Sequence, residues 1–307
     1  MNNKIDIIIP TLDRPCQIQS LVESLKPMLA RGDTITIVWQ GSEKPEIACH
    51  PDIRLYYLPT RNLPTARNFG IRKTSGDIIL FLDDDIEVES NLLHYHRNGY
   101  EDQRVGAVSG FIEDPLFPSG PDKLPKYNTK TGEIIQNFSS PEQTTVISLM
   151  GAQMSFRRTA LEKIEGFDEQ YKGNALWEDV DCAFRLRAAG YMILYEPNAR
   201  VKHIRESTGG CRFSAGARYV FYEFYNTTYF AARFAPTDYL GSWVNFWWHR
   251  LEYRSRKKFY SLKHSPIIVA AGILGACHAI AGYCLAGKQI PGPDTYSSFR
   301  AWAASGE

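Results

Sequence analysis

The first hundred residues alternate short apolar segments with helix-like stretches, and this alternation restricts the fold more than any other feature of the sequence. The apolar segments are rich in β-branched or aromatic residues and are bounded by Pro, Gly or Asp, as is typical of strands. Strands that are apolar on both faces and separated by helices form a parallel sheet covered on both sides. We therefore expect an α/β fold. The predicted strands are residues 5–9, 35–39, 55–58 and 78–82, and the predicted helices are residues 17–30 and 66–74.

The chain beyond residue 100 is less regular. Residues 115–141 are rich in proline and glycine, which predicts a long irregular loop over the site. Residues 178–189 predict a helix closed by Gly190. From about Phe213 the pattern is helical and aromatic. Further predicted strands or extended segments are residues 105–110, 146–150, 153–156, 192–195 and 200–204, with a helix at residues 158–164.

Polar residues follow the predicted strands at their carboxyl ends, where parallel sheets bind ligands. Residues 10–14 follow the first strand, and Gln40 follows the second. Three aspartates, residues 83–85, follow the fourth. Adjacent carboxylates repel one another and are best tolerated where a cation neutralises them. In a turn, Asp83 and Asp85 face the same way while the aspartate between them points elsewhere. Such oxygen ligands suit Mg²⁺ or Mn²⁺ bridged to a diphosphate.

Three adjacent aspartates also occur in solvated acidic turns and in calcium loops of the helix–loop–helix type. The solvated turn stays open. The calcium loop requires Gly and Glu at its sixth and twelfth positions, where this chain has Val88 and His94, so it is excluded. Upstream, a predicted helix start near Arg67 favours an anionic phosphate. Helix capping with a salt bridge is the structural alternative there.

Between residues 4 and 205 the chain carries a series of short motifs: IIIPT (7–11), ARNFGI (66–71), GDIILFLDDD (76–85), GAQMSFRR (151–158), GFDE (166–169), WEDVD (177–181), RLRAAG (185–190) and VKH (201–203). In this order, the motifs resemble those of inverting family 2 glycosyltransferases. The resemblance implies a GT-A nucleotide-diphospho-sugar transferase fold, Rossmann-like, with a mostly parallel central sheet, flanking helices and a helical C-terminal region. It implies a catalytic domain at residues 1–210, with a nucleotide-sugar-binding half at 1–110 and an acceptor half at 111–210. The helical C-terminal region would then be residues 211–307.

The resemblance also implies a role for each matching position. Asp83 and Asp85 resemble the Asp-x-Asp motif, with His203 completing a site for Mn²⁺ or Mg²⁺. Asp179 resembles the catalytic base, and Glu178 and Asp181 compete for that role. Trp177 would be a platform for the acceptor sugar. The residues implied in donor and nucleotide binding are Pro10, Thr11, Asp13, Arg67, Asp83 and Asp84, and we add Gln40 from its place after the second strand.

Each of these assignments has a structural alternative. Acidic residues such as Glu178 and Asp179 are common in the first turn of a helix, His203 can be an ordinary strand-end histidine, and an aromatic such as Trp177 is as often part of a core. The chain also departs from the family after the second strand, where the family's base-reading aspartate is replaced by Gln40. An amide both donates and accepts, so UDP-sugars stay favoured while dTDP- and GDP-sugars remain open.

The C-terminal third has two features of membrane-binding segments. Residues 267–286 contain no Asp, Glu, Lys or Arg and are long enough to span a bilayer. Residues 247–260 combine tryptophans and tyrosines with five cations and one glutamate. The lipid headgroup layer of a membrane attracts side chains of these kinds. We expect peripheral attachment to the cytoplasmic leaflet, where a polyprenyl-linked acceptor would be found. A buried helix with a solvated basic face is the alternative.

Composition excludes several classes. The net charge of +1 argues against a nucleic-acid partner. Six cysteines without a Cys-x-x-Cys pair, and an N-terminal apolar run too short for a signal peptide, predict a cytoplasmic protein with reduced thiols. Two rival functions remain: a saccharide-binding scaffold that has lost catalysis, and a sugar nucleotidyltransferase, although residues 10–15 lack the expected glycine-rich loop. A processive synthase would need several apolar spans and a Gln-x-x-Arg-Trp motif, and neither is present.

Overall fold

The computed structural model describes residues 3–42, 45, 47, 50–115, 119–120, 122–127, 134–206, 210, 217–234 and 266–285. The chain divides into two compact units. The first comprises Met1–Lys126, Gln136–Glu169 and Asp179–Gly210, and the second comprises Tyr127–Ile135, Gln170–Glu178 and Cys211–Glu307. The segment 247–260, on which the membrane expectation chiefly rests, lies outside the described residues.

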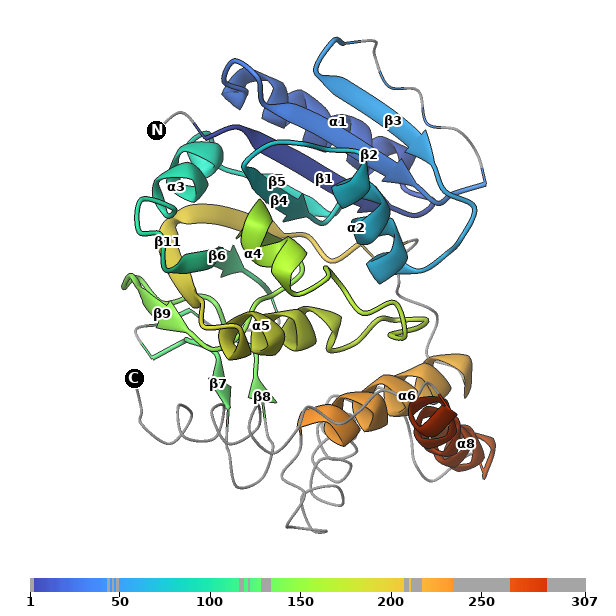
Figure 1. Ribbon diagram of the computed structural model, residues 1–307. Helices are drawn as coiled ribbons and strands as arrows, with labels where there is room; N and C mark the ends of the chain where they lie inside the picture. Colours follow the sequence, from blue (N-terminus) through green and yellow to red (C-terminus); the bar gives the residue numbers. More distant parts are fainter. Residues whose placement is uncertain are drawn as a thin grey trace. The chain divides into compact units, whose positions relative to one another are not determined.

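A nine-stranded sheet forms the centre of the first unit (Figure 1), with the order β3-β2-β1-β4-β10-β6-β11-β5 and β9 paired to β11. The first four strands in this order are mutually parallel, as are β6 and β11. Strand β10 joins these two groups by running antiparallel to both β4 and β6. The strands are β1 (Ile5–Thr11), β2 (Thr34–Trp39), β3 (Ile53–Tyr57), β4 (Ile78–Leu82), β5 (Ile86–Val88), β6 (Val105–Glu113), β9 (Thr144–Val146), β10 (Gln153–Arg157) and β11 (Met192–His203).

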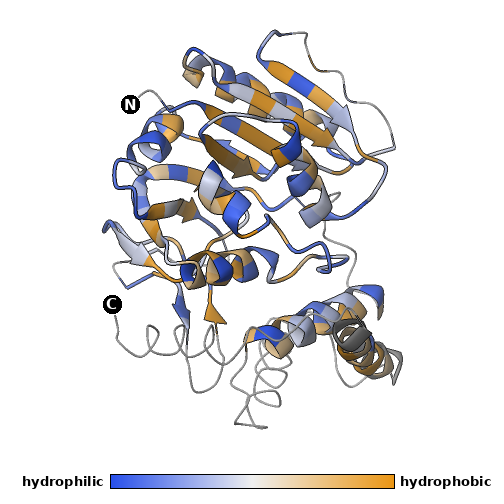
Figure 2. Ribbon diagram, in the orientation of Figure 1, coloured by the Kyte–Doolittle hydropathy of each residue, from blue (hydrophilic) through white to orange (hydrophobic). Residues whose placement is uncertain are grey.

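Helices cover this sheet, and the expected α/β fold is confirmed. Every residue of β1 and β4 is buried, and Figure 2 shows apolar residues along these strands. Helix α1 (Pro15–Leu25) connects β1 to β2, and α2 (Leu63–Arg72) connects β3 to β4, in the opposite direction across the sheet. Because connections between parallel strands are right-handed, these opposite directions place α1 and α2 on opposite faces of the sheet. The helices are α1 (Pro15–Leu25), the 3₁₀ turn η1 (Lys26–Met28), α2 (Leu63–Arg72), α3 (Leu92–Asn98), α4 (Arg158–Lys163) and α5 (Glu178–Ala188).

The structure differs from the sequence-based expectation in several places. The extended segment predicted at residues 146–150 is replaced by β9, which ends at Val146. The two strands predicted at 192–195 and 200–204 are one strand, β11, whose pairing with β6 shifts register between Glu196 and Arg200. This irregularity interrupts the apolar pattern without ending the strand. The short elements β5 and α3 were not predicted. The expected loop at residues 115–141 contains two short paired strands, β7 (Lys126–Tyr127) and β8 (Ile134–Ile135).

The second unit contains helices α6 (Ala217–Phe234) and α8 (Pro266–Leu285), which pack against each other. A Cβ atom at Gly275 would lie 2.2 Å from the carbonyl oxygen of Phe221, so only glycine permits this approach. The helical character expected for this region is confirmed for these residues. Among the described residues, none of the helices combines the length and apolar character needed to cross a membrane.

A buried polar network ties α3 to the sheet. His96 is fully buried; its Nδ1 lies 2.8 Å from Oγ of Ser155 and its Nε2 lies 3.0 Å from Oε1 of Gln153. The Gln153 amide nitrogen donates to the carbonyls of Phe111 and Ala199, so its Oε1 accepts from His96 Nε2–H. Nδ1 is then left to accept from the Ser155 hydroxyl. Burial lowers the pKa of His96 to about 4.

This network predicts an acid-sensitive fold. The folded-state pKa of His96, about 4, lies below the ordinary value of 6.5, so the unfolded chain takes up a proton first as the pH falls. The contribution of His96 to the free energy of unfolding should fall by about 3 kcal/mol between pH 6.5 and pH 4. Urea unfolding of the wild type and His96→Gln at pH 7, 5.5 and 4.5 measures this. At pH 7 the His96→Gln variant should have a lower free energy of unfolding than the wild type, but this free energy should lack the decrease with falling pH that His96 causes. A free energy of unfolding that falls equally with pH in both proteins would contradict the assignment.

Candidate active site

The carboxyl ends of β1, β2 and β4 meet at one edge of the sheet. The three strands are parallel, and Thr11 at the end of β1 pairs in register with Trp39 at the end of β2. Gln40 therefore lies beside the end of β1, where its backbone N–H donates to Thr11. The three aspartates follow β4 at the same edge. Pro10 is buried within β1.

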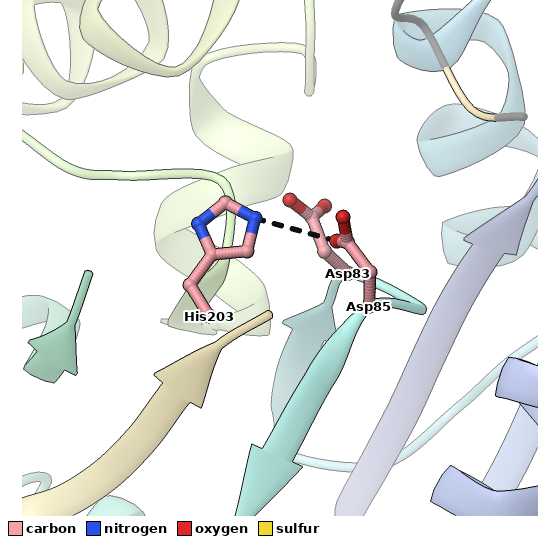
Figure 3. A group of neighbouring side chains, drawn as sticks. All are labelled: Asp83, Asp85 and His203. Carbon is pink, nitrogen blue, oxygen red and sulfur yellow. Dashed lines mark ion pairs between the residues drawn. The ribbon is translucent and has the colours of Figure 1, made fainter. Parts of the chain in front are cut away.

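Asp83, Asp85 and His203 form a cluster at this edge (Figure 3). One side-chain ligand atom from each residue lies within 4.8 Å of the others, a grouping that could hold a metal ion. His203 Nε2 is 3.3 Å from Asp85 Oδ1, and both side chains are buried. The cluster forms because β5 runs antiparallel to β11 and pairs Ile86 with His203, next to Asp85. Two carboxylates and an imidazole are suitable ligands for a divalent cation.

A fourth residue orients the histidine. Asp114, which follows β6, lies with its Oδ2 3.1 Å from His203 Nδ1 and is also paired with Arg205. Burial alone would lower the pKa of His203, but hydrogen bonds to Asp114 and Asp85 and the nearby carboxylate charges raise it. A carboxylate on one ring nitrogen fixes the orientation of the other toward a metal position. Asp114 was not predicted from the sequence, although an aspartate directly after a strand was the available signal.

Asp84 points away from this cluster and is neutralised within the protein. Its carboxylate accepts hydrogen bonds from the hydroxyl of Thr11 and from Arg14, which also lies 3.2 Å from Asp85. Burial raises the pKa of Asp84 to about 6, against the opposing effects of Arg14 and Thr11. Arg14, which the sequence did not single out, therefore balances two of the three adjacent charges.

Asp13 and Gln40 hold the loops at the ends of β1 and β2. Asp13 has a φ of 55°, and its Oδ1 accepts from the backbone N–H of Ser42 at 3.0 Å. The Gln40 side-chain nitrogen donates to the carbonyls of Thr60 and Asn62, which links the end of β2 to the start of α2. Asp13 and Gln40, both expected to bind the donor, thus lie at the edge where β1, β2 and β4 end, and the side-chain nitrogen of Gln40 bonds within the protein.

Arg67 lies inside the unit and is only 1% exposed. Its guanidinium carbon is 5.2 Å from the centre of the Phe167 ring. Its Nη2 is 3.4 Å from the carbonyl oxygen of Gly151 and 3.6 Å from Oδ1 of Asp83. The expected phosphate-binding arginine is therefore held between an aromatic ring, a backbone carbonyl and an aspartate of the cluster.

Asp179 lies at the start of α5 and connects to Arg67 through Gly151. The backbone N–H of Gly151 donates to Asp179 Oδ2 at 2.9 Å, and the N–H of Val180 donates to Oδ1 at 2.8 Å. Burial raises the pKa of Asp179, although the charge of Arg67 and these hydrogen bonds oppose the shift. The structure thus brings Asp83 and Asp179 to the two ends of one chain of contacts.

The other residues of the WEDVD motif are more enclosed. Asp181 is fully buried and paired with Arg185 one turn along α5, which gives it a structural partner. Glu178 is 3% exposed. Trp177 is 8% exposed, and its indole N–H donates to Thr227 at 3.1 Å. These enclosed positions contrast with Asp179, which keeps part of its surface accessible.

Comparison with known proteins gives relatives named for O-antigen biosynthesis and for glycosyl transfer. The chain is 26% identical over 223 residues to the O-antigen biosynthesis protein RfbC of Myxococcus xanthus, covering 65% of this chain and 17% of that protein. It is 27% identical over 208 residues to a pre-mycofactocin glycosyltransferase of Mycobacterium tuberculosis, covering 65% of this chain and 42% of that protein. The chain thus spans less than half the length of both relatives.

The fold has a solved counterpart. The structure of GalNAc-T7 with UDP, GalNAc and Mn²⁺ matches with a TM-score of 0.57 at 14% identity, over 84% of this chain and 58% of that one. The fold is therefore GT-A. The sequence model described as "Glycosyl transferase family 2" matches residues 6–165, more than half of the chain. This match agrees with the motifs read from the sequence, and the chain belongs to glycosyl transferase family 2.

Proposed function

We propose that this protein is a metal-assisted, inverting glycosyltransferase that moves a sugar from a nucleotide-diphosphate sugar to a saccharide or lipid-linked acceptor. The observation that carries the proposal is the chain of contacts from Asp83 through Arg67 and Gly151 to Asp179. It connects a cluster suited to a divalent cation with a carboxylate of raised pKa. Donor activation and acceptor deprotonation need these two kinds of group side by side.

On the donor side, Asp83, Asp85 and His203 would hold Mn²⁺ or Mg²⁺. The nitrogen ligand favours Mn²⁺, and the related fold of GalNAc-T7 is solved with that ion. When bound, the ion supplies Lewis-acid stabilisation of the leaving diphosphate. Asp114 orients His203, and Arg14 limits repulsion among the carboxylates before the donor binds.

On the acceptor side, Asp179 would take the proton of the attacking hydroxyl. Inversion requires the hydroxyl to approach the anomeric carbon opposite the leaving diphosphate, so the base must be fixed in direction. The N–H groups of Gly151 and Val180 fix its two oxygens, and each oxygen keeps a second lone pair for the acceptor. Burial raises the pKa of Asp179, which makes its carboxylate a stronger base.

The nucleotide would bind along the ends of β1 and β2, near Pro10, Thr11, Asp13 and Gln40. UDP-sugars are the favoured donors, and dTDP- and GDP-sugars are the alternatives. The catalytic domain would be residues 1–210. The cations and aromatic residues of the segment 247–260 support peripheral contact with the cytoplasmic leaflet and a polyprenyl-linked acceptor there. Release of the protein from anionic vesicles by high salt would be the expected sign of that contact.

A panel of nucleotide-sugars tests the function. UDP-, dTDP- and GDP-sugars are assayed for thermal shift and for slow donor hydrolysis, with and without Mn²⁺. We expect one nucleotide class to raise the melting temperature and to be hydrolysed only when Mn²⁺ is present. Binding without turnover in any acceptor mixture would favour the scaffold alternative. Release of diphosphate from a nucleoside triphosphate and a sugar-1-phosphate would favour the nucleotidyltransferase.

A further inference from the structure

The loop before Asp179 has an unusual backbone. In the second unit, Gly173, Ala175 and Trp177 have φ values of 60°, 50° and 76°. Residues other than glycine rarely adopt this left-handed conformation, and it persists only where the surroundings hold it. The loop continues directly into Glu178 and Asp179 at the start of α5. Whatever holds this loop therefore also affects how the chain enters the helix of the proposed base.

Asn226 of α6 holds the beginning of the loop. Its Oδ1 accepts from the backbone N–H of Lys172 at 3.0 Å. Its Nδ2 donates to the carbonyl of Lys172 and to Oδ1 of Asn174, both at 2.8 Å. The Asn226 side chain is fully buried. A buried amide is favourable only when its donors and acceptors are satisfied, and here the loop provides all three of these partners.

Thr227, the next residue of α6, holds the end of the loop. Its hydroxyl accepts the indole N–H of Trp177 at 3.1 Å, and the residue is 1% exposed. The Trp177 ring also lies 5.7 Å from the ring of Phe230. Between these two attachments, a Cβ at Gly173 would lie 2.3 Å from the ring of Tyr222, so glycine is required where the loop crosses α6. Helix α6 thus contacts the loop at three places.

We propose that Asn226 and Thr227 are positioning residues that fix the conformation of the loop Lys172–Trp177 and, through it, the orientation of Asp179. The proposal rests on the proposed function, because it assigns these residues to the presentation of its base. Several buried positions of α6, such as Val220, Phe224 and Ala231, are apolar, whereas Asn226 and Thr227 are polar. The two polar side chains bond the loop instead of adding to that apolar surface.

A matched pair of substitutions tests the role of Thr227. Thr227→Val keeps the shape of the side chain and removes the acceptor of the Trp177 N–H. Thr228→Val is the control, because Thr228 is equally buried on the same helix and its hydroxyl has no hydrogen-bond partner within the described residues. We expect Thr227→Val to lower kcat for transfer about tenfold with the donor KM unchanged. Thr228→Val should keep the wild-type kcat, and Thr227→Ser should restore most of it.

Asn226 is tested with Asn226→Asp and Asn226→Ala. Aspartate keeps the acceptor for Lys172 N–H but loses both donated bonds, and alanine loses all three, so kcat should fall in that order, by about 10²-fold for alanine. Donor binding, followed by thermal shift with Mn²⁺, should stay unchanged in every variant. If the Asn226 variants do not fold, the Thr227 and Thr228 pair decides. Equal kcat values in that pair, with only the melting temperature altered, would overturn the positioning role.

Failure of the proposed function and failure of the positioning role would give different results. If the wild type transfers no sugar, or if Asp179→Asn keeps full turnover, the proposed function or its base is wrong. If Asp179→Asn is inactive while Thr227→Val keeps the wild-type kcat, the base stands and only the positioning role is overturned.

Discussion

Asp179→Asn is expected to lower the rate of sugar transfer by about 10²–10⁴-fold, the usual contribution of a positioned general base. Asparagine has nearly the same shape and still accepts one hydrogen bond, but it cannot take a proton from the acceptor hydroxyl. Donor binding should persist, since the cluster of Asp83, Asp85 and His203 is intact. Initial rates at saturating donor, together with a thermal shift titration of the donor, separate the two effects.

Glu178→Gln is the comparison for this prediction. Glu178 is the neighbouring carboxylate and competes for the same role, but it is 3% exposed, so its replacement should lower kcat less. A second readout is the pH profile. Burial raises the pKa of Asp179, so activity should rise with pH through a value above that of an ordinary aspartate. A turnover within twofold of wild type in Asp179→Asn would remove Asp179 from its role.

The parts of the fold that follow from local chemistry were predictable from the sequence. The apolar strands β1 and β4 are buried along their whole lengths, and their Pro, Gly and Asp boundaries mark where they end. Three aspartates at a strand end indicated a cation site, and Asp83 and Asp85 do lie together with His203. These features depend on residues adjacent in sequence, which is why patterns reveal them.

Features that depend on distant pairing were not predictable. Strand β10 runs antiparallel between β4 and β6, and nothing in its five residues indicates this. The pairing of Asp114 with His203 depends on the register of β6 against β11, which shifts along the strand. Asn226 bonds to Lys172 across 54 positions of sequence. A single asparagine within an aromatic helix carries no signal of such a partner.

Removal of divalent cations is expected to lower sugar transfer by at least about 10²-fold, because Lewis-acid stabilisation of a leaving phosphate contributes several kcal/mol. Protein treated with a chelator and then dialysed should be inactive, and Mn²⁺ should restore the rate. Direct binding can be followed separately as a thermal shift with Mn²⁺ alone. Full activity in chelator-treated protein would contradict the assignment of the cluster.

The aspartates of the cluster can be tested against an ordinary surface aspartate. Asp83→Asn removes one charged ligand from a partly exposed side chain, so the fold should tolerate it. Asp85→Asn removes a buried carboxylate that also contacts Arg14 and His203, and it should weaken Mn²⁺ binding further.

Asp102→Asn is the control, because Asp102 pairs with Arg104 at the surface. Both cluster variants should need more Mn²⁺ for half-maximal activity, whereas Asp102→Asn should match the wild type. A Mn²⁺ requirement that is the same in all three variants would place the metal elsewhere, and the carboxylates after β4 would then be a solvated turn.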